Sequence, residues 1–317
     1  MLRRRVEILQ SIHIRAMLKN FLLTLSILSV GCATIAQEAK KDTSYWKKKT
    51  AFGANFNQAS FNDAWSSVQG AKGSVGFNVF FNAKGEYNRG KVNWVNDLQM
   101  QYGLQDNGSG LRKTIDRIFF DTKLGSKISP QWLFIANLNF QTQFSKGYNY
   151  GAGVEVANPD GTTSKADLLV SNLFSPAYIT ESIGLEWKPS KVFNMSFAPG
   201  ALRQTIVADN NIAFTKTGER YGVPDGKTFK NDVALMQIVA TLDKDVAKNI
   251  NLKARYALFI KYNDLAAMDN RLDAKFTAKV NKYISTTFDI IAMYYQDQSA
   301  KLQVAQNLGI GLLYTFP

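Results

Sequence analysis

The chain has 317 residues, 45% of them hydrophobic, and 38 Lys and Arg against 25 Asp and Glu give it a formal net charge of +13. Its single Cys and single His, Cys32 and His13, both precede Thr34. The sequence beyond them therefore excludes disulfides, thiolate nucleophiles, Cys or His metal sites and His-based triads. The basic residues are spread along the chain, with no dense run beyond Lys47–Lys49, so the charge does not indicate nucleic-acid binding.

The N-terminal segment has the pattern of a secretory signal peptide. Lys19 supplies a positive charge, residues 21–30 form an apolar stretch, and Thr34-Ile35-Ala36 is a small-residue cleavage site. The apolar stretch is shorter than the roughly 20 residues that a transmembrane helix needs. The protein is therefore expected to be exported.

We expect residues 1–36 to comprise this cleaved signal peptide and an upstream extension, because Met17 is a better placed start than Met1. Residues 37–48 would then be a short periplasmic segment. The remainder, 49–317, is expected to form a single domain.

From about Lys49 onward, apolar and polar residues alternate with a period of two. Residues 250–262 show this most clearly: Ile250, Leu252 and the following even positions are apolar, and most odd positions are polar. Successive side chains of a strand point to opposite faces, so each segment has one apolar and one polar face. No sustained helical period follows the leader. The pattern predicts strands at 49–60, 72–87, 91–105, 113–128, 131–145, 176–189, 191–207, 230–244, 248–263, 269–282, 283–298 and 301–316.

These strands indicate an all-β fold, a closed antiparallel transmembrane β-barrel of about 12 strands. Strands of about 12–16 residues are long for a soluble sandwich, where five or six residues are typical. They are long enough to cross a bilayer, which takes roughly 9–11 residues. The alternative is a soluble sandwich with a buried edge strand.

The connections alternate between short and long. Short periplasmic turns and long outer loops produce this pattern in outer-membrane barrels, so we expect both ends of the domain to be periplasmic. The longest connections are residues 146–175 and 208–229. Two aromatic girdles are expected, one formed by Trp94, Trp132, Trp187 and Phe316 near the short turns, the other by Tyr102, Phe144, Tyr262 and Tyr294.

Two places depart from the pattern. Pro199-Gly200 interrupts a predicted strand, and because Pro cannot donate to a ladder, we expect a bulge or a break there. Glu181 falls on the lipid-facing parity, and we expect it near the outer end of its strand, where a charge costs less than at the midplane.

The last strand carries an outer-membrane signature. Leu308, Ile310 and Leu312 lie on one face, which ends in the aromatics Tyr314 and Phe316. A soluble protein would rarely end on such an exposed apolar edge. The final aromatic resembles the sorting signal of outer-membrane proteins. We therefore expect a Gram-negative outer-membrane location and insertion by the barrel-assembly machinery.

Several turn sequences occur together: residues 221–227 (Tyr-Gly-Val-Pro-Asp-Gly-Lys), Asn231-Asp232, Asn249–Leu252 and Lys279–Ile284. With them, the chain from about Trp46 to Phe316 resembles a family of predicted outer-membrane β-barrel proteins from Bacteroidota-type bacteria, catalogued as a domain of unknown function. The resemblance implies location and fold. It brings no substrate and no active site.

The inward face of the predicted barrel is polar and partly charged. Symmetric pairing about residues 263–269 would place Lys261 opposite Arg271 and Lys253 opposite Lys279. Like charges directly opposite each other are unfavourable, so water or nearby acids must offset the repulsion. Two interpretations stay open: a narrow basic lumen for small anionic solutes, or an internal ion-pair network that plugs the barrel. The candidate lumen-lining residues are Arg117, Asp121, Lys123, Lys253, Arg255, Lys261, Arg271, Asp273, Lys275, Lys279 and Asp289.

Three function classes are compatible with this sequence. The first is a narrow channel or transporter for small polar or anionic solutes. The second is a non-enzymatic scaffold or accessory subunit with an outer-membrane protein partner. The third, an enzyme embedded in the membrane, could not use a Ser-His site because no His follows His13. No catalytic residue, metal ligand or cofactor is expected, and the expected surroundings are outer-membrane lipid rather than nucleic acid.

Overall fold

The computed structural model describes residues 45–59, 74–108, 110–157, 163–262, 268–281, 283–299 and 301–316. The expected signal peptide and Pro317 lie outside the described residues. The first strand begins at Trp46, three residues before the predicted start at 49. Within the described ranges, no helix is long and apolar enough to cross a membrane.

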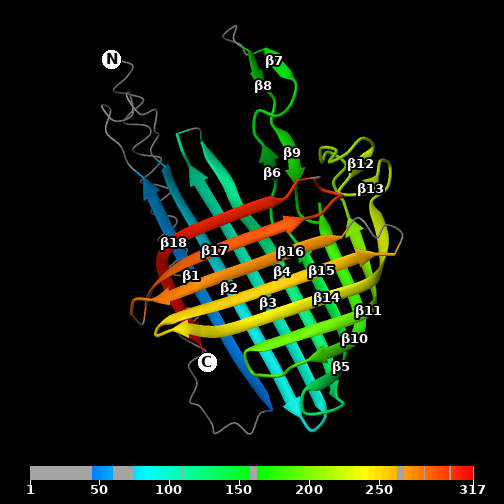
Figure 1. Ribbon diagram of the computed structural model, residues 1–317. Helices are drawn as coiled ribbons and strands as arrows, with labels where there is room; N and C mark the ends of the chain where they lie inside the picture. The colour runs from blue at the N-terminus through cyan, green and yellow to red at the C-terminus, as the bar shows by residue number, and fades with distance from the viewer. Residues whose placement is uncertain are drawn as a thin grey trace. The chain divides into compact units, whose positions relative to one another are not determined.

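Twelve of the described strands close into one antiparallel barrel, which confirms the predicted fold class (Figure 1). Around the ring their order is β1-β18-β17-β16-β15-β14-β11-β10-β5-β4-β3-β2. They are β1 (Trp46–Ala59), β2 (Ser74–Arg89), β3 (Val92–Asp106), β4 (Leu111–Lys127), β5 (Trp132–Thr142), β10 (Ala177–Trp187), β11 (Phe193–Ile206), β14 (Phe229–Ala247), β15 (Ile250–Lys261), β16 (Asp269–Lys279), β17 (Ile284–Tyr294) and β18 (Gln303–Phe316).

The two longest connections contain short strands that the alternation did not predict. Between β5 and β10, β6 (Gly147–Asn149) pairs with β9 (Leu168–Ser171), and β7 (Glu155–Ala157) pairs with β8 (Thr163–Lys165). Between β11 and β14, β12 (Glu219–Arg220) pairs with β13 (Val223–Pro224). Figure 1 shows the β6–β9 arm projecting beyond the barrel wall.

The first and last strands close the ring. Thr50 pairs with Phe316 and Phe56 with Ile310, so the beginning of β1 lies beside the end of β18. Consecutive barrel strands run antiparallel, so every second connection returns to this end. These connections are the short turns at 90–91, 128–131, 188–192, 248–249 and 280–283. The long connections emerge at the opposite end, called the loop end below.

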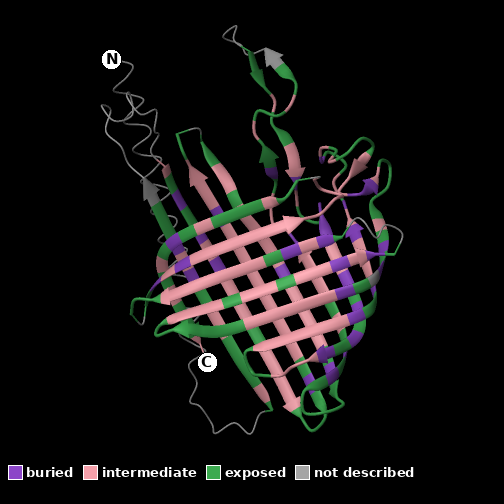
Figure 2. Cartoon of the chain, viewed as in Figure 1, coloured by how far each residue is buried: buried purple, intermediate pink, exposed green. Residues whose placement is uncertain are grey.

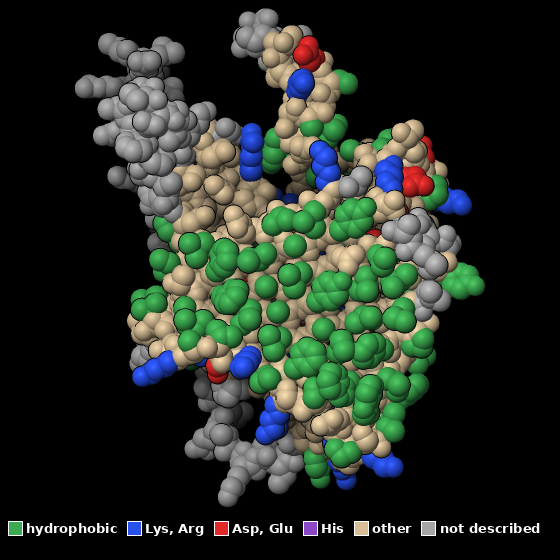
Figure 3. All heavy atoms as spheres, in the orientation of Figure 1, with side chains coloured by type: hydrophobic (Ala, Val, Ile, Leu, Met, Phe, Trp, Pro, Cys, Tyr) green, Lys and Arg blue, Asp and Glu red, His purple; other side chains and the backbone are tan. Residues whose placement is uncertain are grey.

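The outer wall is apolar. Leu308, Ile310 and Leu312 of β18 are each more than 60% exposed. Figure 3 shows hydrophobic side chains spread over the wall formed by β14 to β18. Along β10, buried and exposed residues alternate from Thr180 to Glu186, and Figure 2 shows buried positions recurring along the strands rather than forming one block. An exposed apolar wall around a closed sheet is what contact with lipid requires.

Aromatic residues gather near both ends of the barrel. At the short-turn end, the Trp46 and Trp94 ring centroids lie 5.5 Å apart, and those of Trp132 and Trp187 lie 6.4 Å apart. At the loop end, Tyr102 contacts Phe144 edge-on, with centroids 6.3 Å apart. These pairs include Trp94, Trp132 and Trp187 of one expected girdle and Tyr102 and Phe144 of the other.

The Pro199-Gly200 step produces the expected bulge. On one side of β11, the pairing with β14 is interrupted between Ala198 and Ala201 but keeps its register. On the other side, the register with β10 shifts once, between Ile183 and Leu185, which flank Gly184. A Cβ atom on Gly184 would lie 2.0 Å from the Phe197 carbonyl oxygen, so only glycine fits opposite the bulge.

Glu181 corrects one expectation. Its side chain is exposed on the outer wall, as its parity predicts. It is, however, the fifth of the eleven residues of β10 and pairs with Leu138 and Leu202, so it does not lie near the end of its strand. The alternation fixed its face, but its depth depends on where β10 begins.

Candidate functional site

The polar face of the strands encloses the barrel interior. Its residues include the buried aromatics Phe119 on β4 and Phe259 on β15, which share their parity with Arg117 and Arg255. Ion pairs between strands that are not neighbours in the ring can form only across this interior. Such pairs therefore identify the side chains that occupy it.

One ion pair crosses the whole interior. Arg117 on β4 places Nη1 3.3 Å from Oδ1 of Asp273 on β16. Five strands separate β4 from β16 in either direction around the ring, so the two residues stand on opposite walls. Both side chains are more than 80% buried. The interior is therefore spanned by side chains at this level.

Two further arginines surround the same carboxylate. Arg271 donates to Asp273 from Nε at 2.8 Å and from Nη2 at 2.7 Å. Arg255 is the cross-strand partner of Asp273, and its guanidinium carbon lies 5.3 Å from the centroid of the Phe119 ring. These groups, Arg117, Arg255, Arg271 and Asp273, are called the arginine cluster. Two guanidinium groups contact this carboxylate and a third stands on the neighbouring strand, so the four groups together carry a formal charge of +2.

The register of the β15–β16 hairpin differs from the predicted one. Arg271 lies opposite Ala257, and Lys253 lies opposite Lys275 rather than Lys279. A shift by an even number of residues keeps every side chain on its face, so the alternation could not detect it. Lys261 extends beyond the paired region, where it contacts Asp297 at 2.5 Å and Asp269 at 4.0 Å.

The remaining candidates divide between the interior and the rim. Lys123 reaches past β5 to Glu186 on β10. Lys275 lies 3.1 Å from Asp289, and Asp121 accepts from the Asn139 amide at 3.1 Å. Two candidates lie at the short-turn rim instead: Lys253, which is 54% exposed beside Asp243, and Lys279, the exposed last residue of β16.

Sequence reasoning missed several interior partners. Glu186 has the inward parity of β10 and could have been found by the same alternation. Asp297 could not, because it lies in a connection without a period. Arg203 was also missed; its Nη1 lies 2.6 Å from Asp269, and its guanidinium lies 3.9 Å from the centroid of the Phe259 ring.

The segment 295–299, between β17 and β18, folds against the loop end of the barrel. Asp297 contacts Lys261 at 2.5 Å and Lys230 at 3.5 Å. Gln298 donates to the Tyr178 hydroxyl at 2.7 Å. Burial raises the pKa of the Asp297 carboxyl, but the hydrogen bond and charge of Lys261 and the charge of Lys230 outweigh it, so this pKa lies below its usual range. The segment is thus held by ion pairs that need an ionised carboxylate.

Nothing in the described interior forms a metal centre: no group of three or more His, Cys, Asp or Glu side chains there could hold an ion. Its carboxylates instead accept from Lys, Arg or amide groups. This arrangement can fix a charged lining in place, and such a lining can act electrostatically on charged solutes.

Comparison with known proteins supports the resemblance to a family without an assigned role. Residues 56–148, less than half of the chain, match a family described as a protein of unknown function (DUF3078). No curated protein matches the chain.

Solved structures with a similar fold are distant. One is the translocator domain of the autotransporter NalP from Neisseria meningitidis, at 9% identity and a TM-score of 0.38, covering 94% of this chain and 96% of that one. A NanC porin structure has 9% identity and a TM-score of 0.37, covering 83% and 98%. An outer membrane channel from Pseudomonas putida F1 has 6% identity and a TM-score of 0.36, covering 88% and 99%.

Proposed function

We propose that this protein is a β-barrel of a Gram-negative outer membrane, exported with a cleaved signal peptide and inserted by the barrel-assembly machinery. The support is physical. The ring is closed, its outer wall is apolar, and aromatic pairs lie near both ends. Only a sheet without edges can satisfy its backbone in lipid. We propose no catalytic role, because most of the interior charges named above are held in ion pairs.

Within that membrane, we propose a narrow channel that prefers small anions. The arginine cluster carries the proposal, since it places a formal charge of +2 where side chains from opposite walls meet. Like charges in a confined, poorly screened space raise the local concentration of counter-ions. A barrel of about 12 strands lies between small filled barrels and wide porins, so the passage is expected to be narrow.

The test is the reversal potential under a salt gradient in a planar bilayer. The wild-type channel should select anions. Arg117→Ser should enlarge the conductance and weaken the selectivity, because it removes one charge and the link between the walls. Lys279→Ser is the matched control, since this cation lies exposed at the rim. A cation-selective wild type, or selectivity unmoved by Arg117→Ser, would contradict the proposal.

The second candidate is a plugged scaffold for an outer-membrane partner. It is favoured by the link between Arg117 and Asp273 and by segment 295–299, which together bridge the interior and its loop end. The projecting β7–β8 hairpin offers a contact surface. This reading expects no conductance from the wild type or from Arg117→Ser. It also expects a stoichiometric partner that is lost when a flexible linker replaces β7–β8.

A further inference from the structure

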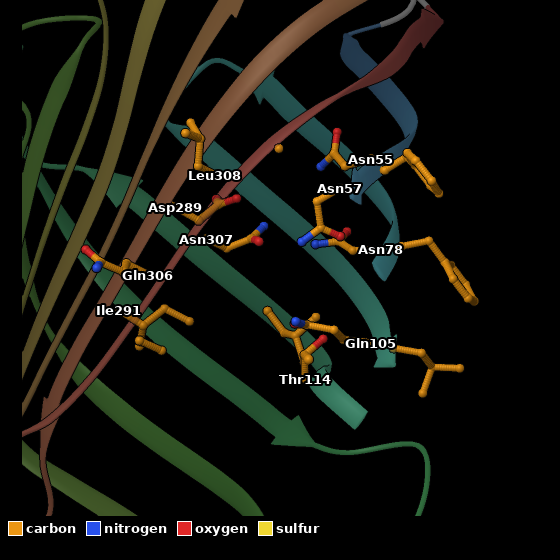
Figure 4. Close-up of a pocket in the computed structure, with 16 residues that line it drawn as sticks. Asn55, Asn57, Asn78, Gln105, Thr114, Asp289, Ile291, Gln306, Asn307 and Leu308 are labelled. Carbon is orange, nitrogen blue, oxygen red and sulfur yellow. The ribbon is translucent and has the colours of Figure 1, made fainter. Parts of the chain in front are cut away.

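A cavity of about 210 Å³, lined by both polar and apolar residues, lies on the inner wall, between β17 and β18 on one side and β1 to β4 on the other. Figure 4 shows Asn57, Asn78 and Gln105 pointing across it toward Asp289 and Asn307. None of the members of the arginine cluster lines this cavity. It is therefore a separate feature of the interior.

Three residues that line this cavity each carry a buried oxygen atom without a hydrogen-bond partner: Asn55 Oδ1, Asn78 Oδ1 and Asp289 Oδ2. The Asn55 and Asn78 side chains belong to residues that are only 6% and 8% exposed. Burying such a group unpaired costs free energy, so nearly all buried polar groups in proteins find a partner. Turning an amide over would exchange an unpaired acceptor for an unpaired donor. The carboxylate oxygen requires a donor in either case.

The cavity carries no net charge. Among the described residues that line it, Asp289 is the one with a charged side chain. Lys275 Nζ lies 3.1 Å from Asp289 Oδ1 and neutralises it, while Oδ2 is left to accept. Neither a free anion nor a metal ion has an electrostatic advantage here. The lining offers amide groups, which both donate and accept, and one strong acceptor, beside apolar side chains such as Ile115 and Ile291.

We propose that this cavity binds a small uncharged solute with several hydroxyl groups, of about the size of a monosaccharide. Each hydroxyl donates one hydrogen bond and accepts others, as the amide lining requires. The volume holds on the order of seven waters at about 30 Å³ each, which suits a ligand of this size. The site goes beyond the proposed anion passage, because its lining residues and its chemistry differ from those of the arginine cluster.

The test is isothermal titration calorimetry on the full-length barrel in detergent, with glucose as the probe. Potassium phosphate and ammonium chloride are the charged alternatives. Two variants address the lining: Asn78→Leu removes one amide, and Asp289→Asn removes the strong acceptor. Asn137→Leu is the matched control, because this inward amide on β5 donates to the Thr122 carbonyl away from the cavity. Heat-modifiable migration on gels verifies that each variant folds.

Glucose should bind saturably to the wild type and to Asn137→Leu. Both lining variants should bind at least about tenfold more weakly, the loss expected when a hydrogen bond to a buried polar group is removed. Three results would overturn the proposal: no saturable glucose binding by the folded wild type, preference for phosphate or ammonium, or binding unchanged in Asn78→Leu. The ion selectivity of the channel is measured separately, so either proposal can fail alone.

Discussion

Arg117 and Asp273 meet at 3.3 Å although five strands separate β4 from β16 in each direction around the barrel. Their contact ties opposite walls together through the interior. It also gathers Arg255 and Arg271 around the same carboxylate. The charges that define the proposed passage are thus also part of what holds the barrel in shape.

Asp273→Asn should destabilise the barrel by about 3–5 kcal/mol, because removing one partner of a buried pair leaves uncompensated charge. The guanidinium groups of Arg117 and Arg271 would lose their shared carboxylate. Denaturant unfolding in lipid vesicles measures this. Asp243→Asn is the control, since Asp243 and Lys253 form a half-exposed ion pair at the rim. This substitution should lower the free energy of unfolding by less than about 1 kcal/mol. Equal losses would mean that the interior pair is solvated.

Glu181→Leu should stabilise the barrel by up to about 2 kcal/mol, because Glu181 is exposed on the outer wall in the middle part of β10. Glu186→Leu, on the opposite face of the same strand, should destabilise it, because Glu186 is buried and paired with Lys123. The comparison uses unfolding in vesicles of defined thickness. Effects of the same sign would show that the two faces of β10 are wrongly assigned.

Removing residues 314–317 should block assembly. The truncation deletes Tyr314 and Phe316, which pair with Phe52 and Thr50 where the first and last strands close the ring. An open edge in lipid leaves backbone groups unsatisfied. Outer-membrane fractionation and heat-modifiable gel migration provide the measurement. A truncated protein that is inserted and heat-modifiable like the wild type would refute the expectation.

Gly222→Ala should displace segment 295–299, and Gly226→Ala should not. Both glycines have a positive φ, near +78° and +77°, so both substitutions strain the backbone. A Cβ on Gly222 would also lie 2.9 Å from the carboxyl carbon of Asp297, whereas a Cβ on Gly226 would meet no atom within 4 Å. Hydrogen exchange of residues 295–299 separates the two effects. Equal exchange in both variants would exclude the steric contact.

Acid should release the same segment. The pKa of Asp297 is lower in the folded protein than its unfolded value near 3.8. The stabilisation that its ionised carboxylate gives the segment is therefore fully present above pH 3.8 and is lost as the pH falls through the folded pKa. Faster proteolysis at 295–299 is therefore expected below about pH 3.8. Asp297→Asn should show this faster cleavage already at neutral pH, where Lys261 would lack its charged partner. Cleavage independent of both pH and substitution would show that the ion pairs do not hold the segment.

The sequence by itself determined which residues face lipid and which face the interior. The period of two assigned Leu308 and Ile310 to the outer wall and Arg117 and Asp273 to the interior, and it located all twelve barrel strands. This was possible because the two faces of a membrane-spanning sheet meet different media. Successive residues of a strand point to opposite faces, so apolar and polar residues alternate along the sequence.

The tertiary structure alone decided which interior residues meet. Alternation is unchanged when a strand slips by an even number of residues, so the predicted Lys253–Lys279 pairing was wrong and Lys275 lies opposite Lys253. Contacts across the lumen depend on ring closure, which makes β4 and β16 opposite walls. Asp297 joins Lys261 only because a connection without any period folds back onto the barrel. Contacts between distant strands and loops arise from closure and register, and local sequence patterns record neither.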